Sequence, residues 1–99
     1  LAFMSSLWGS VADSSGGFDL YRTSKASLNM LAKGIAEQQA DPREIAVLAL
    51  HPGWVQTDMG GPNATLTIDE SVTGLADVLE SAGGKGFRYV DYAGKDLPF

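Results

Sequence analysis

The chain is 99 residues long, which is enough for one small domain and no more. Its hydrophobic content of 44% and charged content of 19% are ordinary for a globular protein. The net charge of −5 argues against a nucleic-acid surface, which would need a basic stripe. The sequence has no Cys and no apolar run long enough to span a bilayer. We therefore expect a globular protein of a reducing, cytoplasmic compartment that binds neither nucleic acid nor membrane and has no metal site.

Residues 1–5 predict the end of a strand that is already buried within a domain. The chain opens on Leu1 and stays apolar up to Met4, without the basic segment or the cleavage site of a signal peptide. We therefore interpret the chain as a piece of a longer protein. Residues 7–20 are rich in Gly, Ser and Asp and predict a loop.

A helix is predicted from Tyr21 to about Gln39, and Asp41-Pro42 ends it. Its apolar residues recur at spacings of three and four and should form the buried face: Leu28, Met30, Leu31 and Ile35. The next element is the apolar run Ile45–Leu50, which lies between two prolines. Such a short continuous run is typical of a strand buried on both faces of a parallel sheet.

A long loop, residues 51–66, precedes a second predicted helix. Thr67 and Glu70 form the capping box that opens this helix, and Gly83-Gly84 ends it. Four apolar residues should form its buried face: Ile68, Val72, Leu75 and Leu79. Phe87–Val90 is predicted as a final strand. This alternation of strands and helices predicts an α/β protein with a parallel sheet, whose exposed edges should pair with strands of a missing N-terminal part.

Tyr21 and Lys25 are the residues whose types and spacing most clearly indicate a chemical function. In a helix, positions i and i+4 lie on one face, one turn apart. The ammonium group then favours the ionised form of the phenol, which can exchange a proton near neutral pH. The positive N-terminal end of the helix acts in the same direction. With a Ser hydroxyl from Ser5-Ser6 to hold a carbonyl oxygen, these residue types suit reversible carbonyl reduction once a cofactor supplies hydride.

Three motifs, in this order, resemble those of the short-chain dehydrogenases/reductases: Ser6-Leu7-Trp8-Gly9, Tyr21-x-x-x-Lys25 and Pro52-Gly53-Trp54-Val55-Gln56-Thr57. Tyr-x-x-x-Lys alone is a weak signal, but the three motifs together with the predicted helix and buried strand are a specific one. The sequence looks most like the sniffer-like and C-factor-like carbonyl reductases. The resemblance implies a doubly wound Rossmann-type sheet. Residues 1–99 would be the C-terminal portion of a single NAD(P)-binding domain whose N-terminal half is missing.

The resemblance also implies a catalytic role for each residue that matches a motif. Tyr21 takes the place of the acid that protonates the substrate oxygen. Lys25 takes the place of the residue that supports the Tyr and binds the nicotinamide ribose. Ser6 would polarise the carbonyl, and its neighbour Ser5 should point the other way.

The cofactor and the substrate follow from the same resemblance. Val55 and Thr57 match the positions that contact the nicotinamide carboxamide and the pyrophosphate region. The implied cofactor is NADP or NAD, with NADP preferred, and the implied substrate is a small carbonyl compound. The expected function is therefore hydride transfer between a nicotinamide cofactor and a carbonyl or alcohol, as in a carbonyl reductase. The resemblance also allows a homo-oligomer.

Two features of the family are absent from these residues: the Gly-rich phosphate-binding loop and the upstream Asn of the catalytic tetrad. The chain alone should therefore be inactive as a reductase. One alternative is an inactive family member that acts as a binding or signalling module, and another is a truncated product that does not fold. Tyr21 and Lys25 could also be an exposed helix pair, and Ser6 could simply end a strand. For His51, which precedes Pro-Gly, a structural role is favoured over an acid–base one.

Overall fold

The computed structural model describes residues 1–40, 45–82 and 86–99. Strands and helices alternate in it along the chain. The elements are β1 (Ala2–Met4), the 3₁₀ turn η1 (Leu7–Gly9), α1 (Asp19–Ile35), the π-helical turn η2 (Ala36–Ala40), β2 (Ala46–His51), α2 (Ile68–Ser81) and β3 (Gly86–Asp91). None of the helices in this described part is long and apolar enough to cross a membrane. The predicted helix ends at Asp41-Pro42 and Gly83-Gly84 lie outside the described residues.

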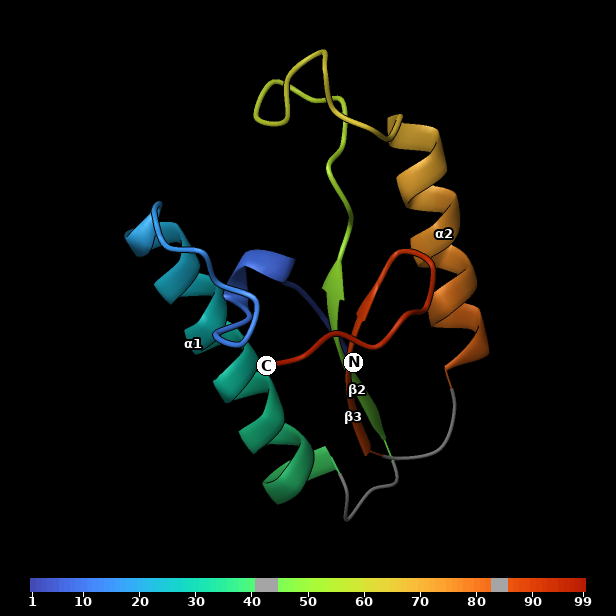
Figure 1. The fold of residues 1–99 in the computed structure, drawn as a ribbon. Coiled ribbons are helices and arrows are strands. Elements are labelled where there is room, and N and C mark those ends of the chain that lie inside the picture. Colours follow the sequence, from blue (N-terminus) through green and yellow to red (C-terminus); the bar gives the residue numbers. More distant parts are fainter. Residues whose placement is uncertain (41–44, 83–85) are drawn as a thin grey trace.

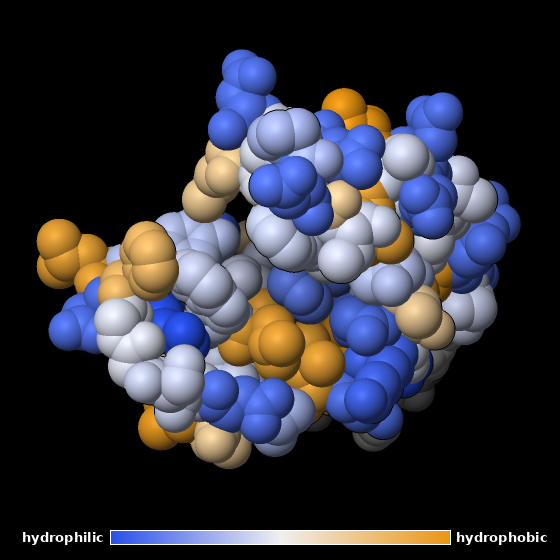
Figure 2. All heavy atoms as spheres, turned by 45° about the horizontal axis from the view of Figure 1, so that its top comes forward, coloured by the Kyte–Doolittle hydropathy of each residue, from blue (hydrophilic) through white to orange (hydrophobic). Residues whose placement is uncertain are grey.

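The strands form one parallel sheet in the order β1-β2-β3, with α1 on one face and α2 on the other (Figure 1). This arrangement confirms the predicted α/β class. The carboxyl ends of the strands meet at one edge of the sheet, and the loops that follow β1 and β2 rise from that edge. Figure 2, which tilts this edge toward the reader, shows apolar surface in the middle and polar side chains around it.

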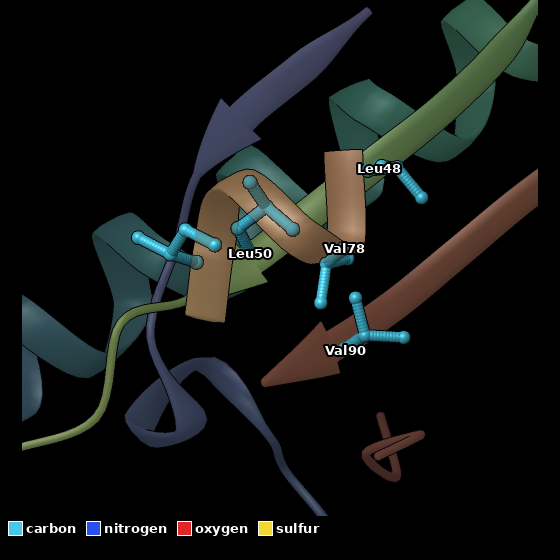
Figure 3. Close-up of a cluster of buried hydrophobic side chains, with 5 residues drawn as sticks. Leu48, Leu50, Val78 and Val90 are labelled. Carbon is cyan, nitrogen blue, oxygen red and sulfur yellow. The ribbon is translucent and has the colours of Figure 1, made fainter. Parts of the chain in front are cut away.

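The core on the α2 face is built by alternate residues of the central and last strands. Side chains of a strand point alternately to its two faces, so residues two apart in β2 and β3 face the same helix. This cluster consists of Leu48, Leu50, Leu75, Val78 and Val90 (Figure 3). Thr67 caps α2 through the predicted capping box with Glu70, which is confirmed.

The core on the α1 face is built around small residues. Ala32 and Ala36 of the helical segment pack on Val47 of β2, and Phe3 and Phe87 lie beside them. All three of the central residues are at most 1% exposed. Because alanine side chains are short, the helix axis can lie close to the sheet at this point.

The predicted buried face of α1 is partly wrong. Leu28 and Ile35 are half-buried. Met30 is 73% exposed and Leu31 is 65% exposed, whereas the residues buried within α1 are Asn29 and Ala32. The residues that contact the sheet continue the row that starts at Tyr21 and Lys25, because Asn29 follows Lys25 by one turn. Tertiary contacts of this row with β1 set the rotation of the helix and override its apolar pattern.

The predicted buried face of α2 is also partly wrong. Leu75 is buried as predicted, but Ile68, Val72 and Leu79 are 53%, 57% and 46% exposed. The other buried residues of the helix are Ser71 and Val78. The Ser71 hydroxyl donates a hydrogen bond of 2.6 Å to the carbonyl of Pro52 at the end of β2. This contact turns the Ser71 side of the helix toward the sheet, so that Leu75 and Val78 enter the core one and two turns later.

Candidate active site

A tight turn of residues with left-handed backbone conformation precedes α1 and positions Tyr21 at the site. Gly16, Gly17 and Phe18 have φ values of 84°, 82° and 52°, and Phe18 is the only one of them with a side chain to strain that conformation. The Arg22 guanidinium closes the turn by donating to the Gly17 carbonyl at 2.8 Å. Helix α1 therefore begins at Asp19, two residues before the predicted start, and Tyr21 lies in its first turn.

Tyr21 and Lys25 lie one turn apart on one face of α1, beside the end of β1. The Lys25 Nζ is 5.7 Å from the centre of the Tyr21 ring. The same Nζ donates to the carbonyl of Met4, the last residue of β1, at 3.2 Å. The structure thus brings the phenol and the ammonium group together at the carboxyl edge of the sheet. An ammonium group has three N–H donors, so the Met4 carbonyl takes only one of them.

Ser6 lies where β1 turns into η1, and it is 7% exposed. Its Oγ accepts a hydrogen bond of 3.1 Å from the backbone N–H of Trp8. Because that bond uses a lone pair of the hydroxyl, the Ser6 proton stays available to a carbonyl oxygen. The Ser5 hydroxyl instead donates to Asn29 Oδ1 at 2.6 Å, so the two hydroxyls have different partners.

Trp8 joins the Ser6 turn to the first turn of α1. Its ring meets the Tyr21 ring edge-on with centroids 6.1 Å apart, and it lies 4.9 Å from the Phe18 ring. The Arg22 guanidinium lies over the same indole at 4.6 Å, within the range of a cation–π contact. These contacts place Ser6, Tyr21 and Lys25 around one corner of the molecule.

Val55 and Thr57 belong to the loop that follows β2. Figure 1 shows that this loop rises from the same edge of the sheet. Val55 forms an isolated parallel bridge with Leu66. The Thr57 hydroxyl accepts from the N–H of Gly60 at 3.1 Å, which closes a turn. Within the described part of the chain, no hydrogen bond joins Val55 or Thr57 to Ser6, Tyr21 or Lys25.

Two open depressions mark the surface. One adjoins the loop after β2 and is lined by Gln56, Thr57, Asp58, Gly61, Pro62 and Ile68. The other lies between α2 and Tyr92–Gly94, and none of its lining residues is a predicted site residue. Within residues 1–40, 45–82 and 86–99, no group of three or more His, Asp or Glu side chains is placed to hold a metal ion.

His51 ends β2, opposite Asp91 of β3. Burial lowers the pKa of His51 from its ordinary value of 6.5, and the charge of Asp91 opposes that effect. Its Nδ1 is buried and has no hydrogen-bond partner among the described residues. The structural role of His51 stays a prediction.

Asn29 and Tyr89 are two polar residues of this corner that the sequence analysis missed. Asn29 is 2% exposed and Tyr89 is 3% exposed. The signal for Asn29 was its spacing of four from Lys25, which continues the row of Tyr21 and Lys25 along the helix. Tyr89 gave no signal, because it joins the site from the other end of the chain.

Gly9 lets η1 lie directly against α1. A Cβ atom at this residue would be 2.9 Å from the Lys25 backbone carbon and 3.0 Å from Asn29 Nδ2. We expect Gly9→Ala to push η1 off the helix and to lower the free energy of unfolding of the full-length protein by about 1 to 3 kcal/mol. Urea unfolding measures this loss.

Gly34→Ala is the matched control for Gly9→Ala. Gly34 lies within α1, and a Cβ there would meet nothing within 4 Å. Alanine in a helix is more favourable than glycine, so this variant should gain about 0.5 to 1 kcal/mol. Equal stability of Gly9→Ala and Gly34→Ala would contradict the close packing of η1 on α1.

The sequence matches the family model for short chain dehydrogenase over residues 1–66, which include every predicted site residue. The chain is 41% identical over 101 residues to C-signal of Myxococcus xanthus, an alignment that covers 100% of this chain and 60% of that protein.

Solved structures of other proteins are similar to this chain in both sequence and fold. A short-chain dehydrogenase/reductase from Burkholderia multivorans with bound NADP has a TM-score of 0.88 and 44% identity, over 99% of this chain and 43% of that one. The carbonyl reductase Sniffer of D. melanogaster has a TM-score of 0.91 and 37% identity, over 99% of this chain and 40% of that one. This chain thus spans less than two thirds of each of these proteins. The family match and these similarities show that the chain belongs to the short-chain dehydrogenase/reductase family.

Proposed function

We propose that this chain is the C-terminal portion of an NAD(P)-binding domain, and that the full-length protein transfers hydride between a nicotinamide cofactor and a carbonyl or alcohol. One observation carries the proposal: Lys25 Nζ lies 5.7 Å from the Tyr21 ring and donates to the Met4 carbonyl, next to the Ser5-Ser6 segment. Membership of the family supports it. That the chain spans 43% and 40% of two solved relatives supports the view that it is a portion of a domain.

The polar groups at this edge suit a nicotinamide nucleotide. In open parallel sheets, such cofactors bind at the carboxyl ends of the strands. Lys25 has N–H groups to offer a ribose hydroxyl, and the loop of Val55 and Thr57 offers backbone groups and a hydroxyl. The NADP bound in the Burkholderia relative supports NADP over NAD. When bound, such a cofactor would supply the hydride or accept it.

Each of the three catalytic side chains would have one task. The Ser6 hydroxyl, which already accepts from the Trp8 N–H, donates its proton in a hydrogen bond to the carbonyl oxygen. The Tyr21 hydroxyl gives that oxygen its proton as the alcohol forms. Lys25 and the N-terminal end of α1 stabilise the phenolate that remains. In alcohol oxidation the same groups act in reverse, and the phenolate takes the proton.

The experiment is an NADPH oxidation assay with a panel of small aldehydes and ketones. The full-length protein should consume NADPH and form the alcohol in equal amounts. The 99-residue chain alone should show no turnover, because the proposal places the phosphate-binding glycine loop in the remainder of the domain. Turnover by the isolated chain would contradict its assignment as a portion of the domain.

The alternative function is a binding or signalling module without catalysis. It is favoured by one observation, which is that a relative with 41% identity bears the name C-signal. A full-length protein that binds NADPH but oxidises it with no member of the panel would support this alternative over the reductase.

A further inference from the structure

The Ser5-Ser6 segment follows β1 and contacts β2, η1, α1 and β3. The Ser5 N–H donates to the carbonyl of Leu50 in β2 at 2.7 Å, which extends the pairing of β1 with β2 by one residue. Ser5 is 3% exposed and Ser6 is 7% exposed. Beyond Ser6 the chain turns into η1, and α1 packs against that turn. The position of the Ser6 hydroxyl therefore depends on what holds these two residues.

Helix α1 holds the first of the two serines. The Ser5 hydroxyl donates to Asn29 Oδ1 at 2.6 Å, and both groups are buried. Asn29 lies one turn beyond Lys25, so the helix that presents Lys25 also binds the segment that presents Ser6. The Asn29 Nδ2 is buried without a partner among the described residues.

Strand β3 holds the second serine. The Tyr89 hydroxyl donates to the backbone carbonyl of Ser6, although the two residues are 83 positions apart in the chain. The same carbonyl accepts from the N–H of Gly9 at 3.0 Å. Burial raises the pKa of Tyr89 above its ordinary value of 10.0, and Asn29 opposes that effect. The Tyr89 hydroxyl therefore keeps its proton through the neutral range and remains a donor.

These contacts fix the backbone on both sides of the Ser6 side chain. The backbone carbonyl of Ser6 accepts from the Tyr89 hydroxyl and the Gly9 N–H. The Ser6 Oγ accepts from the Trp8 N–H. Only a rotation about χ1 would then move the hydroxyl, and the bond to Trp8 restrains that rotation. A group that must meet a reacting oxygen gains from such a support, because a misplacement of about 1 Å can cost about 10²-fold in rate.

Resting on the proposed reductase function, we propose that Tyr89 and Asn29 are positioning residues, which hold the Ser5-Ser6 peptide so that the Ser6 hydroxyl meets the carbonyl oxygen of the substrate. Neither residue touches the substrate in this arrangement. They act through Ser6 alone, so their effect on catalysis should vanish when the Ser6 hydroxyl is absent.

Tyr89→Phe in the full-length protein is the first test. Phenylalanine keeps the ring, which packs 5.5 Å from that of Phe99, and removes only the hydroxyl. With NADPH and the fastest acceptor of the panel, kcat should fall by about 10-fold to about 10²-fold. The NADPH dissociation constant, measured by quenching of tryptophan fluorescence, should stay within about twofold. Tyr92→Phe is the matched control, since Tyr92 packs against the core on the α2 face, and it should leave kcat unchanged.

A double-mutant cycle separates positioning from a general loss of stability. In a Ser6→Ala background, Tyr89→Phe and Asn29→Ala should each change the residual kcat by no more than about twofold. A full loss in that background would show that they act on the enzyme without Ser6, and would overturn the proposal. An unchanged kcat for Tyr89→Phe in the parent would overturn it as well.

Amide hydrogen exchange provides a readout that needs no turnover. The N–H groups of Trp8 and Gly9 donate to Ser6, so Tyr89→Phe should speed their exchange, and Tyr92→Phe should not. Unchanged exchange rates at both amides would show that the Tyr89 hydroxyl does not hold the Ser6 peptide, and would overturn its role as a positioning residue. If Ser6→Ala and Tyr21→Phe leave turnover intact, the reductase mechanism fails. If those two variants lose most of their turnover and Tyr89→Phe keeps the kcat of the parent, only the positioning role fails.

Discussion

Tyr21→Phe should lower kcat for carbonyl reduction by the full-length protein by about 10²-fold to about 10⁴-fold, the usual contribution of a general acid. The substitution removes one hydroxyl and keeps the ring that meets Trp8 edge-on at 6.1 Å. The first turn of α1 should therefore keep its place. Because the lost interaction forms only as the proton is transferred, kcat and kcat/KM should fall together.

Steady-state kinetics with NADPH and the best acceptor of the panel measure this loss. The NADPH dissociation constant should stay close to that of the parent, since the proposal assigns the ribose contact to Lys25. Tyr92→Phe again serves as the control for removal of a phenol hydroxyl, with full activity expected. A kcat of Tyr21→Phe near that of the parent would rule out Tyr21 as the acid.

Local signals in the sequence were sufficient for the order and type of the elements. The apolar run at residues 45–50 predicted a buried parallel strand, and β2 occupies Ala46–His51 at the centre of the sheet. Thr67 and Glu70 predicted the capping box that opens α2. The spacing of Tyr21 and Lys25 predicted their common face on α1, because helix geometry alone determines it.

The features that could not be predicted depend on contacts between residues that are far apart in the sequence. The stripe with Met30 and Leu31 has helical periodicity, yet the face with Asn29 and Ala32 contacts the sheet. No property of the helix sequence alone decides between two such faces. The bond from the Tyr89 hydroxyl to the Ser6 carbonyl joins residues 83 positions apart, and only the register of β3 in the sheet brings them together.

The left-handed backbone conformation of Phe18 could not be predicted for another reason. A positive φ is rare for a residue with a bulky side chain, so sequence rules place it at glycine. Here the preceding Gly16 and Gly17 are also left-handed, and the turn continues through Phe18 into α1. The Phe18 ring lies 4.9 Å from Trp8, a contact that offsets part of the strain.

Lys25→Met should affect catalysis and cofactor binding at once. Methionine keeps most of the aliphatic length and removes the ammonium group, which lies 5.7 Å from the Tyr21 ring. Alcohol oxidation requires the phenolate as the base, and a neighbouring cation favours that ion. Without the cation that ion loses a stabilising neighbour, so kcat for alcohol oxidation should fall. The KM for NADPH should rise, because a donor to the ribose is lost.

Lys25→Arg separates the charge from the shape of the side chain. Arginine restores a positive charge near Tyr21, so it should return kcat for alcohol oxidation most of the way toward that of the parent. Its planar guanidinium cannot reproduce a compact ammonium group that donates to the Met4 carbonyl and to a ribose together, so the KM for NADPH should recover only in part. Steady-state kinetics of the three proteins, with the alcohol for kcat and with NADPH for KM, make this comparison. If Lys25→Met left both kcat for oxidation and the KM for NADPH unchanged, Tyr21 and Lys25 would not act as a pair, and the binding or signalling module would explain this corner of the fold better than the reductase.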